Sequence, residues 1–463
     1  METCGLDTWD MDARQEPTIR VGIVLPEDDM QQVRVVIPDS DYQVWLDDMC
    51  GPVVRSVRLA ALVEDERLVL RSAEGAMGPA SVIRLTPQVD LPIVAGAGVQ
   101  VRGAMTGRGF HWQKRFHPLL AGMLEFRVHD GSLLVVNDVP LEIYLAGVLT
   151  AEMSGNCPVE FLKSQTIVAR SWVLAFTMDK HPDLPIDYCN DDDCQRYHGT
   201  TNLTKEALDA VSATRGQVLV DANREIIDAN YAKTCGGISE SPENVWFVTK
   251  AGLRAAVDAP AGSEVERFFP ITESNLDEYL TGDWLRDTDI FCSPTVVSEE
   301  QYARYLGKVD EPEHYFRWRM RYDREDLEQI LRDNFFNRQG PGRVAALSTL
   351  LDLRVVRRGL SGRVVELDIR YCDPMGQTHS VIVRGQHKIR DALHEKFLYS
   401  SAFKIEIDRD EHGLPRRITF NGAGWGHGVG MCQIGALGMA LKGYDCRQIV
   451  EHYFEGLDVF TCY

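Results

Sequence analysis

The chain has 463 residues, of which 44% are hydrophobic and 25% charged, and these values are typical of a globular protein of about two to four domains. Its formal net charge of −20 argues against nonspecific binding to nucleic acid or to an anionic membrane surface. No apolar run reaches the roughly 18 residues of a transmembrane helix, and the N-terminus lacks the basic and apolar segments of a secretory signal. The eleven cysteines are scattered and odd in number, which favours metal ligands or buried thiols over a disulfide scaffold.

Short β-rich runs fill the first part of the chain, at residues 20–25, 53–70 and 91–101. They predict a β-rich N-terminal region over residues 1–118. The stretch LEFRVHDGSLLVVND follows, with Asp130-Gly131 between two apolar runs. This pattern predicts a β-hairpin with a two-residue turn.

A pair of helices is predicted next, beginning with VPLEIYLAGVLTAEM. Leu141, Leu145, Val148 and Glu152 recur at the spacing of one helix face. A carboxyl group on an apolar face is desolvated, which raises its pKa, so Glu152 is a candidate general acid. The alternative is that Glu152 ends the helix and is solvated.

The second helix is expected to start at Asn156-Cys157-Pro158, with Asn156 as its cap, and to run to about Lys180. Lys163 and Arg170 are seven residues apart, so they share a face of this helix. Their charges could bind anionic or polar groups of a substrate, or they could be ordinary surface charges.

The loop HPDLPIDYCNDDDCQRYHG carries a candidate metal site. His181, Cys189 and Cys194 offer nitrogen and sulfur ligands that suit zinc, and Cys235 or Cys432 could join them through folding. Buried free thiols and a Cys189–Cys194 disulfide are the alternatives. The three aspartates between the cysteines add oxygen donors, but we expect them to form a solvated turn. No H-E-x-x-H motif supports a zinc protease.

The remaining segments are less regular. GQVLVDANREIIDANYAKTCGG predicts a strand pair that ends in a Gly-Gly turn, and residues 250–345 are expected to be mostly helical. Strands are predicted within residues 351–371, and FKIEIDRDEHGLPRRITF predicts a strand–turn–strand. Near the C-terminus, Gly443 is expected to end one helix, and Asp445 with Gln448 forms a capping box for the last one.

GAGWGHGVGMCQIGA, residues 422–436, alternates glycine with other residues. It matches neither the P-loop nor the dinucleotide-binding fingerprint. Alternating glycines expose the backbone, so a ligand or another strand could lie against it. His427 is then either a polar group presented on a bare surface or a structural histidine in a tight turn.

Three blocks in this order resemble the stage II sporulation protein D family, also called SpoIID/LytB. They are VVNDVPLEIYLAGVLTAEM with CPVEFLKSQTIVARSWVLAF; CQRYHG with AVSATRGQVLV and IIDANYAKTCGGISESPENVW; and GAGWGHGVGMCQIGALGMALKGYDCRQIVEHYF. A fourth segment, IRDALHEKFLYSSAF, resembles the family more weakly. The resemblance covers roughly residues 133–250 and 389–456, and three separated matches in one order make it specific.

The resemblance implies a peptidoglycan lytic transglycosylase, which cuts the glycan between N-acetylmuramic acid and N-acetylglucosamine and leaves a 1,6-anhydro end. It implies that Glu152 is the single acid and base. Ordinary glycosidases use two carboxylates, and no second acidic residue stands out in the matching blocks. We expect contacts with the substrate from Lys163, Gln165, Arg170, Tyr197, His427 and Gln433.

Some members of that family carry a zinc ion near the active site, held by a histidine and two cysteines after the second helix, so the resemblance makes zinc an expected cofactor here. His181, Cys189 and Cys194 match in kind, although a spacing that departs by a few residues leaves His198 as an alternative to His181. Cys432 stands where many relatives have serine, which argues against a nucleophilic role for that position.

The expected fold is therefore α+β, with a β-rich N-terminal region and a mixed α/β catalytic region in which the helix pair packs on sheet. The predicted divisions are residues 1–118, the two core parts 119–250 and 389–463, and an insertion of uncertain fold at 251–388. Peptidoglycan glycan strands are the expected partner, and a cell-wall amidase is a second one.

Two other functions stay open. The chain could be a non-catalytic accessory protein that binds cell wall and enhances an amidase. It could also be a cytosolic, zinc-stabilised protein that has the fold of this family but another function. The function implies the cell envelope, whereas no export signal is visible.

Overall fold

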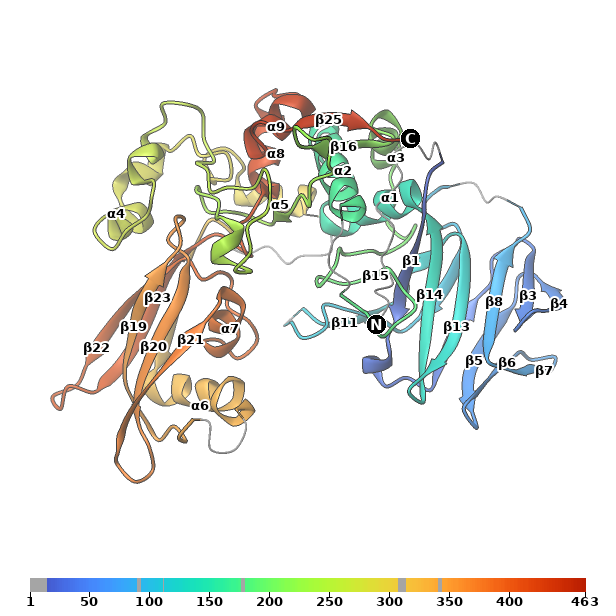
Figure 1. Cartoon of the computed structure of the whole chain (residues 1–463), viewed down its shortest axis with the longest axis horizontal. Helices are drawn as coiled ribbons and strands as arrows, with labels where there is room; N and C mark the ends of the chain where they lie inside the picture. Colours follow the sequence, from blue (N-terminus) through green and yellow to red (C-terminus); the bar gives the residue numbers. More distant parts are fainter. Residues whose placement is uncertain (1–14, 90–92, 111, 176–179, 307–313, 340–343) are drawn as a thin grey trace. The chain divides into compact units, whose positions relative to one another are not determined.

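The computed structural model describes residues 15–89, 93–110, 112–175, 180–306, 314–339 and 344–463 (Figure 1). The chain forms two compact units: a first unit of residues 1–218, 303–311 and 459–463, and a second unit of residues 219–302 and 312–458. The predicted α+β class with a β-rich N-terminal part is confirmed. Among the described residues, no helix is both long and apolar enough to span a membrane.

The β-rich part of the first unit is built from two sheets. The larger has seven strands in the order β15-β1-β14-β13-β8-β3-β4, and the other has six in the order β12-β9-β2-β5-β6-β7. The larger sheet contains β15 (Tyr188–Cys189), β1 (Thr18–Val24), β14 (Ser132–Pro140), β13 (Met123–His129), β8 (Val82–Pro87), β3 (Tyr42–Leu46) and β4 (Met49–Val54). The other contains β12 (Leu119–Leu120), β9 (Val99–Arg102), β2 (Gln32–Val36), β5 (Arg58–Glu64), β6 (Arg67–Arg71) and β7 (Ala76–Ala80), and β10 (Ala104–Thr106) pairs separately with β11 (Lys114–Phe116).

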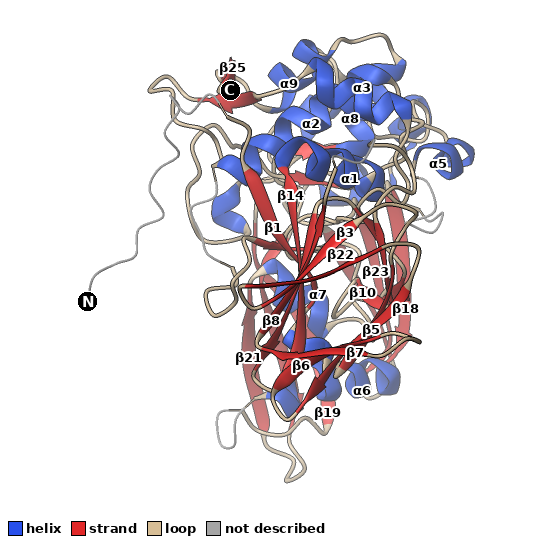
Figure 2. Ribbon diagram, turned by 90° about the vertical axis from the view of Figure 1, so that its right-hand side faces the viewer, coloured by secondary structure: helices blue, strands red, loops and turns tan. Residues whose placement is uncertain are grey.

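The two sheets pack against each other through one face of each. Buried residues alternate with exposed ones along β2, β6 and β8, as expected for strands with one covered face. Val35 and Leu70 of the smaller sheet and Ile83 and Phe126 of the larger one are fully buried. Figure 2 shows these strands in red.

The predicted hairpin is confirmed, because Asp130 and Gly131 join β13 to β14 with positive φ angles of 48° and 74°. β14 also pairs with β1 along Thr18–Val24. Strands from both sides of residue 118 therefore share one sheet, which the local patterning of the N-terminal region could not indicate.

The predicted helix pair is α1 (Leu141–Glu152) and α2 (Val159–Leu174), and α3 (Lys205–Ala213) packs on both. α1 starts directly after β14 and is buried on all sides, so it is not the one-faced helix that its spacing predicted. Pro158 rather than Asn156 caps α2, without a side-chain hydrogen bond. α2 ends at Leu174 instead of about Lys180, and residues 176–179 lie outside the described part of the chain.

The second unit has one large hydrophobic core between two three-stranded sheets and two helices. The sheets are β18 (Arg317–Asp323), β23 (Pro415–Ala423) and β22 (Phe403–Arg409), and β19 (Thr349–Arg358), β20 (Val364–Cys372) and β21 (Thr378–Arg384). α6 (Arg324–Asn334) and α7 (Gln386–Ala392) contact these strands (Figure 1). The predicted strand–turn–strand is confirmed as the β22–β23 hairpin.

Shorter elements complete the chain. They are α4 (Leu276–Thr281), α5 (Glu299–Tyr305), α8 (Gln433–Leu441) and α9 (Cys446–Tyr453), the strand pairs β16 (Gln217–Val220) with β25 (Asp458–Thr461) and β17 (Tyr231–Ala232) with β24 (Met431–Cys432), and 3-10 turns at Pro26–Asp28, Pro242–Asn244, Glu264–Phe268, Asp283–Asp287 and Phe336–Arg338. Gly443 follows α8 with a φ of 90°, and the Asp445–Gln448 capping box opens α9, as predicted.

Two expectations for the middle of the chain are wrong. The described part of residues 250–345 is mostly irregular, with the short helices α4, α5 and α6 and the strand β18, rather than mostly helical. The strand pair predicted in 216–237 is reduced to a single bridge between Val220 and Ile226. Tyr231–Ala232 instead pairs in parallel with Met431–Cys432, about 200 residues away, and no local pattern encodes that partner.

Candidate functional site

Glu152 is the last residue of α1, and it is buried rather than solvated. Only 9% of the residue is exposed, because α1 is enclosed by neighbouring elements. Its Oε1 accepts a hydrogen bond of 3.0 Å from the backbone N–H of Arg196. The cysteine loop therefore reaches back to the end of α1, and it holds this carboxylate in a fixed orientation.

A second acidic residue, Asp192, lies beside Glu152. One oxygen of Asp192 pairs with Arg196 Nε at 2.6 Å, and the other accepts a 2.8 Å hydrogen bond from Trp112 Nε1. The Arg196 guanidinium also lies 5.4 Å from the centre of the Trp112 ring. Burial, with a smaller effect of the Glu152 charge, raises the pKa of Asp192 to about 6, against the opposing effect of Arg196.

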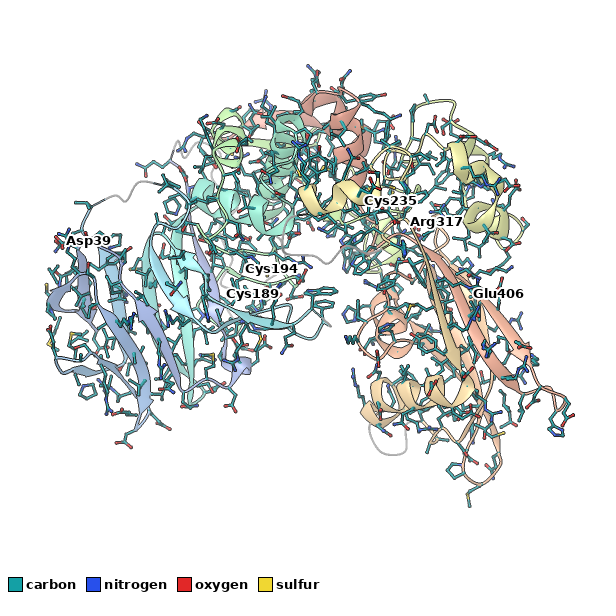
Figure 3. The ribbon with its side chains drawn as sticks, turned by 180° about the vertical axis from the view of Figure 1, so that it is seen from behind. Asp39, Cys189, Cys194, Cys235, Arg317 and Glu406 are labelled. Carbon is teal, nitrogen blue, oxygen red and sulfur yellow. The ribbon has the colours of Figure 1, made fainter. Side chains whose placement is uncertain are left out.

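The predicted metal ligands are brought together. Ligand atoms of His181, Cys189, Asp193 and Cys194 all lie within 4.8 Å of one another, and Cys194 Sγ is 3.5 Å from His181 Nε2. Figure 3 shows Cys189 and Cys194 close together. Cys189 is held in β15, which pairs in parallel with β1. Of the three aspartates in this loop, only Asp193 is on the exposed turn that we expected.

The alternative ligand, His198, is not in this group. It is buried, its Nε2 lies 3.4 Å from Thr106 Oγ1, and its ring packs on Phe116 with centroids 4.5 Å apart. His181 is therefore the histidine of the cluster.

The residues expected to bind substrate on α2 have other contacts in the first unit. Arg170 is fully buried, and it forms two hydrogen bonds with Glu142, of 2.6 and 3.0 Å. Lys163 pairs with Glu160 at 2.8 Å, and Gln165 is fully buried. Arg170 thus ties α2 to α1 and has no exposed surface to offer a ligand.

Tyr197 is also buried. Its hydroxyl donates a 2.9 Å hydrogen bond to Asn137 Oδ1, and its ring packs against Tyr144 with centroids 5.0 Å apart. Burial raises the pKa of Tyr197. Its described contacts are those of a core residue.

The glycine stretch lies against another segment of the second unit. β24 pairs with β17, and isolated bridges join Trp425 to Thr234 and Val429 to Glu240. A side chain at Gly430, where φ is 73°, would start 2.0 Å from the carbonyl oxygen of Asn230. The alternating glycines therefore permit close approach of two backbones, one of the two arrangements that the sequence left open.

His427 is partly exposed within this stretch. Its Nδ1 accepts a 3.0 Å hydrogen bond from the Val429 N–H, and its ring lies 5.0 Å from that of Trp246. Desolvation and then the positive charges of Arg363, Arg390 and Lys250 lower the pKa of His427 to about 3. The imidazole is therefore neutral. Gln433, the first residue of α8, is 1% exposed.

Cys235 and Cys432 do not join the group formed by His181, Cys189, Asp193 and Cys194, here called the His181 group. They converge with Asp258 and Cys292 in a second buried group, all within the second unit.

Sequence reasoning missed several residues around Glu152 and several in the second buried group. Asp192 and Arg196 were within quoted motifs, but their contacts with Glu152 depend on the path of the loop. Trp112, Asp258 and Cys292 carried no local signal, because their partners are 80, 23 and 57 residues away. Trp246 ends the quoted block IIDANYAKTCGGISESPENVW, but only the structure shows that it is 38% exposed and lies beside His427.

Comparison with known proteins supports the resemblance drawn from the motifs. The family model described as Stage II sporulation protein matches residues 129–220, which contain Glu152 and the His181 group. A second model, described as a domain of unknown function (DUF8618), matches residues 268–430.

Three relatives align over much of the chain. An uncharacterised protein of Brachyspira hyodysenteriae is 24% identical over 338 residues, covering 73% of this chain and 71% of that protein. Stage II sporulation protein D of Bacillus amyloliquefaciens is 23% identical over 398 residues, covering 82% and 92%. The amidase enhancer of Bacillus subtilis is 22% identical over 318 residues, covering 67% of this chain but only 39% of that protein.

Proposed function

From the premise that this chain belongs to the SpoIID/LytB family, we propose that it is a peptidoglycan lytic transglycosylase that acts in the cell envelope. The observation that carries the proposal is the buried carboxylate of Glu152, which ends α1 inside the matched segment and is oriented by the Arg196 N–H. A carboxyl group in such a setting suits general acid–base catalysis.

In the proposed reaction, Glu152 donates its proton to the glycosidic oxygen as the bond between C1 of N-acetylmuramic acid and that oxygen breaks. The carboxylate then accepts the proton of the 6-hydroxyl of the same sugar, whose oxygen bonds to C1. The leaving strand keeps the first proton, Glu152 regains one, and no water is consumed. One carboxyl group therefore serves both steps, whereas hydrolysis generally requires two.

The contacts of Asp192 support a single acid and base. Trp112 and Arg196 donate hydrogen bonds to its two oxygens, so Asp192 is engaged on both sides. A general base for water needs an oxygen within reach of that water. We propose that Asp192 positions Arg196, and through it Glu152, and does not activate water.

Zinc fits the His181 group. Zinc–sulfur and zinc–nitrogen bonds of about 2.3 and 2.0–2.1 Å at tetrahedral angles put the two ligand atoms roughly 3.6 Å apart. The distance from Cys194 Sγ to His181 Nε2 is 3.5 Å, and Cys189 and Asp193 supply two more donors. When bound, zinc would supply a structural cross-link of the loop that carries Asp192 and Arg196.

We expect Cys189→Ser to lower the affinity of this group for zinc. Loss of a residue that only hydrogen-bonds to a metal ligand lowers metal affinity by about 10–100-fold, and loss of the ligand itself should lower it by more. Glycan cleavage should fall as well, because the loop that holds Glu152 would loosen. Metal analysis and product yield would be measured together, with the exposed Cys50→Ser as the control. Unchanged zinc content would contradict the assignment of Cys189 as a ligand.

We also propose that the surface around His427 binds glycan. Trp246 and Phe247 are 38% and 57% exposed, and exposed aromatic surface of this kind marks binding sites. The Lys250 ammonium lies 4.3 Å from the centre of the Trp246 ring. It also contacts Asn230 and Asp228, and these contacts fix its position against the ring.

Trp246→Ala is expected to weaken binding to peptide-free glycan by more than about 1 kcal/mol, or roughly fivefold in Kd. Met375→Ala, which removes an 85% exposed side chain of the same unit, is the matched control and should bind normally. Because the pKa of His427 is about 3, its imidazole stays neutral, and its contribution to binding should be constant between about pH 5 and pH 8, where an ordinary histidine titrates. Equal binding by Trp246→Ala and the wild type would refute the proposed surface.

The decisive test is the chemistry of the product. Purified protein would be incubated with intact peptidoglycan and with peptidoglycan stripped of stem peptides, and the fragments identified by mass spectrometry. Anhydro ends would support the transglycosylase, whereas new reducing ends would contradict it and indicate hydrolysis. Binding without any product would instead favour an accessory role, which the match to the amidase enhancer makes the second candidate. In that case the protein should raise the activity of a cell-wall amidase added to the digest.

A further inference from the structure

Four side chains that could ligate a metal meet in the interior of the second unit. They are Cys235, Asp258, Cys292 and Cys432, all buried, with ligand atoms within 4.8 Å of one another. Cys235 follows β17, and Cys432 ends β24 and caps α8. The four residues are thus brought together from widely separated parts of the chain.

The distances between these atoms suit one tetrahedral ion. Cys235 Sγ lies 3.8 Å from Cys292 Sγ and 3.3 Å from Asp258 Oδ2. Two sulfurs at about 2.3 Å from one zinc ion are roughly 3.8 Å apart at a tetrahedral angle, and sulfur and oxygen ligands are roughly 3.6 Å apart. All four ligand atoms lie within 4.8 Å of one another, as the ligands of a single tetrahedral ion do.

The outer contacts are those of a metal-bound carboxylate. The Tyr453 hydroxyl donates a 2.7 Å hydrogen bond to Asp258 Oδ1, and Oδ2 is the oxygen that faces Cys235. Such outer partners orient metal ligands. Gly435 leaves the space for this arrangement, because a side chain there would start 2.5 Å from Asp258 Oδ2 and would also clash with the Tyr453 hydroxyl.

The sulfurs receive backbone hydrogen bonds, as thiolate ligands do. The N–H groups of Cys235 and Gly435 donate to Cys432 Sγ at 3.2 and 3.3 Å, and that of Gly237 donates to Cys235 Sγ at 3.3 Å. Cys432 also sits at the N-terminus of α8, where the helix dipole favours a negative charge.

The guanidinium groups of the fully buried Arg363 and the partly buried Arg317 balance negative charge at this position. Arg363 Nη2 donates to the Cys235 carbonyl oxygen at 3.3 Å, and Arg317 Nη1 donates to that of Gly236 at 2.8 Å. Figure 3 shows Arg317 close to Cys235. Buried thiolates and a carboxylate would be unfavourable alone, and a divalent cation together with these two arginines compensates their charge.

We propose that Cys235, Asp258, Cys292 and Cys432 bind one zinc ion. All four positions of the tetrahedron come from the protein and are buried, which makes the site structural rather than catalytic. It joins the segment after β17 to the start of α8. Because Arg363 holds the Cys235 carbonyl and also packs against Gly428, the ion fixes the backbone on which His427 stands.

The first measurement is the zinc content of the purified full-length chain and of single variants. We expect Cys292→Ala to lose one zinc per chain relative to wild type, and Cys50→Ser, at an exposed cysteine, to lose none. Adding Cys292→Ala to a Cys189→Ser chain should again remove one zinc, which separates this site from the His181 group. An unchanged zinc content in Cys292→Ala would overturn the proposal.

A second measurement needs no variant and holds even if Cys292→Ala fails to fold. Native wild-type protein would be alkylated with and without a zinc chelator, and the modified cysteines located by mass spectrometry. We expect Cys235, Cys292 and Cys432 to be protected until the chelator is added, while Cys50 reacts throughout and the buried Cys157 reports on general unfolding. Protection that survives chelation, or a disulfide between Cys235 and Cys292, would refute the zinc site.

Discussion

Glu152→Gln is expected to lower the rate at which 1,6-anhydro ends appear by about 10²- to 10⁴-fold, the usual contribution of a general acid or base. Glutamine has nearly the shape of glutamate, and its Oε1 can still accept the Arg196 N–H that now binds Glu152 at 3.0 Å. It cannot donate a proton to the leaving oxygen or take one from the 6-hydroxyl. The variant should therefore fold and bind glycan while losing turnover.

Glu160→Gln is the matched control. It makes the same change of charge on the neighbouring helix, at a side chain that is 31% exposed and paired with Lys163. Its rate should stay close to that of the wild type, because surface ion pairs contribute little. If Glu152→Gln kept more than about a tenth of the wild-type rate, the proposed role of Glu152 would be wrong, since a tenth corresponds to only about 1.4 kcal/mol of barrier.

The second large effect is structural. We expect Arg170→Met to destabilise the protein by about 3–5 kcal/mol, because it leaves the Glu142 carboxylate buried without its partner. Arg170 is fully buried, and besides Glu142 it donates a 2.9 Å hydrogen bond to the Gln217 carbonyl oxygen. The Tyr463 hydroxyl and the Gly216 N–H also contact Glu142, so one carboxylate holds α1, α2 and the chain end. The midpoint of denaturant unfolding would measure the loss.

Arg55→Met is the control, and it tests whether the loss of any ion pair would lower the stability of the protein as much. Arg55 pairs with Asp39 through a single hydrogen bond of 2.8 Å, and the two side chains are 55% and 80% exposed. Removing this pair should leave the midpoint of denaturant unfolding close to that of the wild type, because solvent screens an exposed pair. Adding Glu142→Gln to Arg170→Met should recover part of the stability, because the unpaired charge is gone. A loss below about 1 kcal/mol for Arg170→Met would mean that the carboxylate finds another partner.

Local sequence patterns predicted the elements whose causes are local. The Asp130-Gly131 turn, the helix end at Gly443 and the Asp445–Gln448 capping box each depend on a few neighbouring residues, and all are confirmed. The motifs also led to the resemblance to the SpoIID/LytB family, which the match at residues 129–220 supports. The spacing of His181, Cys189 and Cys194 grouped three residues that the structure brings together.

Local patterns failed where distant contacts decide. The periodicity of α1 predicted one buried face, but strands and two further helices enclose it on all sides. Asp192 stood in the cysteine loop as one of three similar aspartates. Its place beside Glu152 follows from the path of that loop, which the pairing of β15 with β1 directs.

The sequence by itself determined the class of fold, the resemblance to the SpoIID/LytB family and the choice of Glu152 as the candidate acid, because each follows from residue order within short segments. Only the tertiary structure decided how the cysteines divide, with Cys189 and Cys194 beside His181 and with Cys235 and Cys432 beside Cys292 and Asp258. The hydrogen bond from the Cys235 N–H to Cys432 Sγ joins residues 197 positions apart. Contacts at such separations arise from the packing of whole elements, and no spacing in the sequence records them.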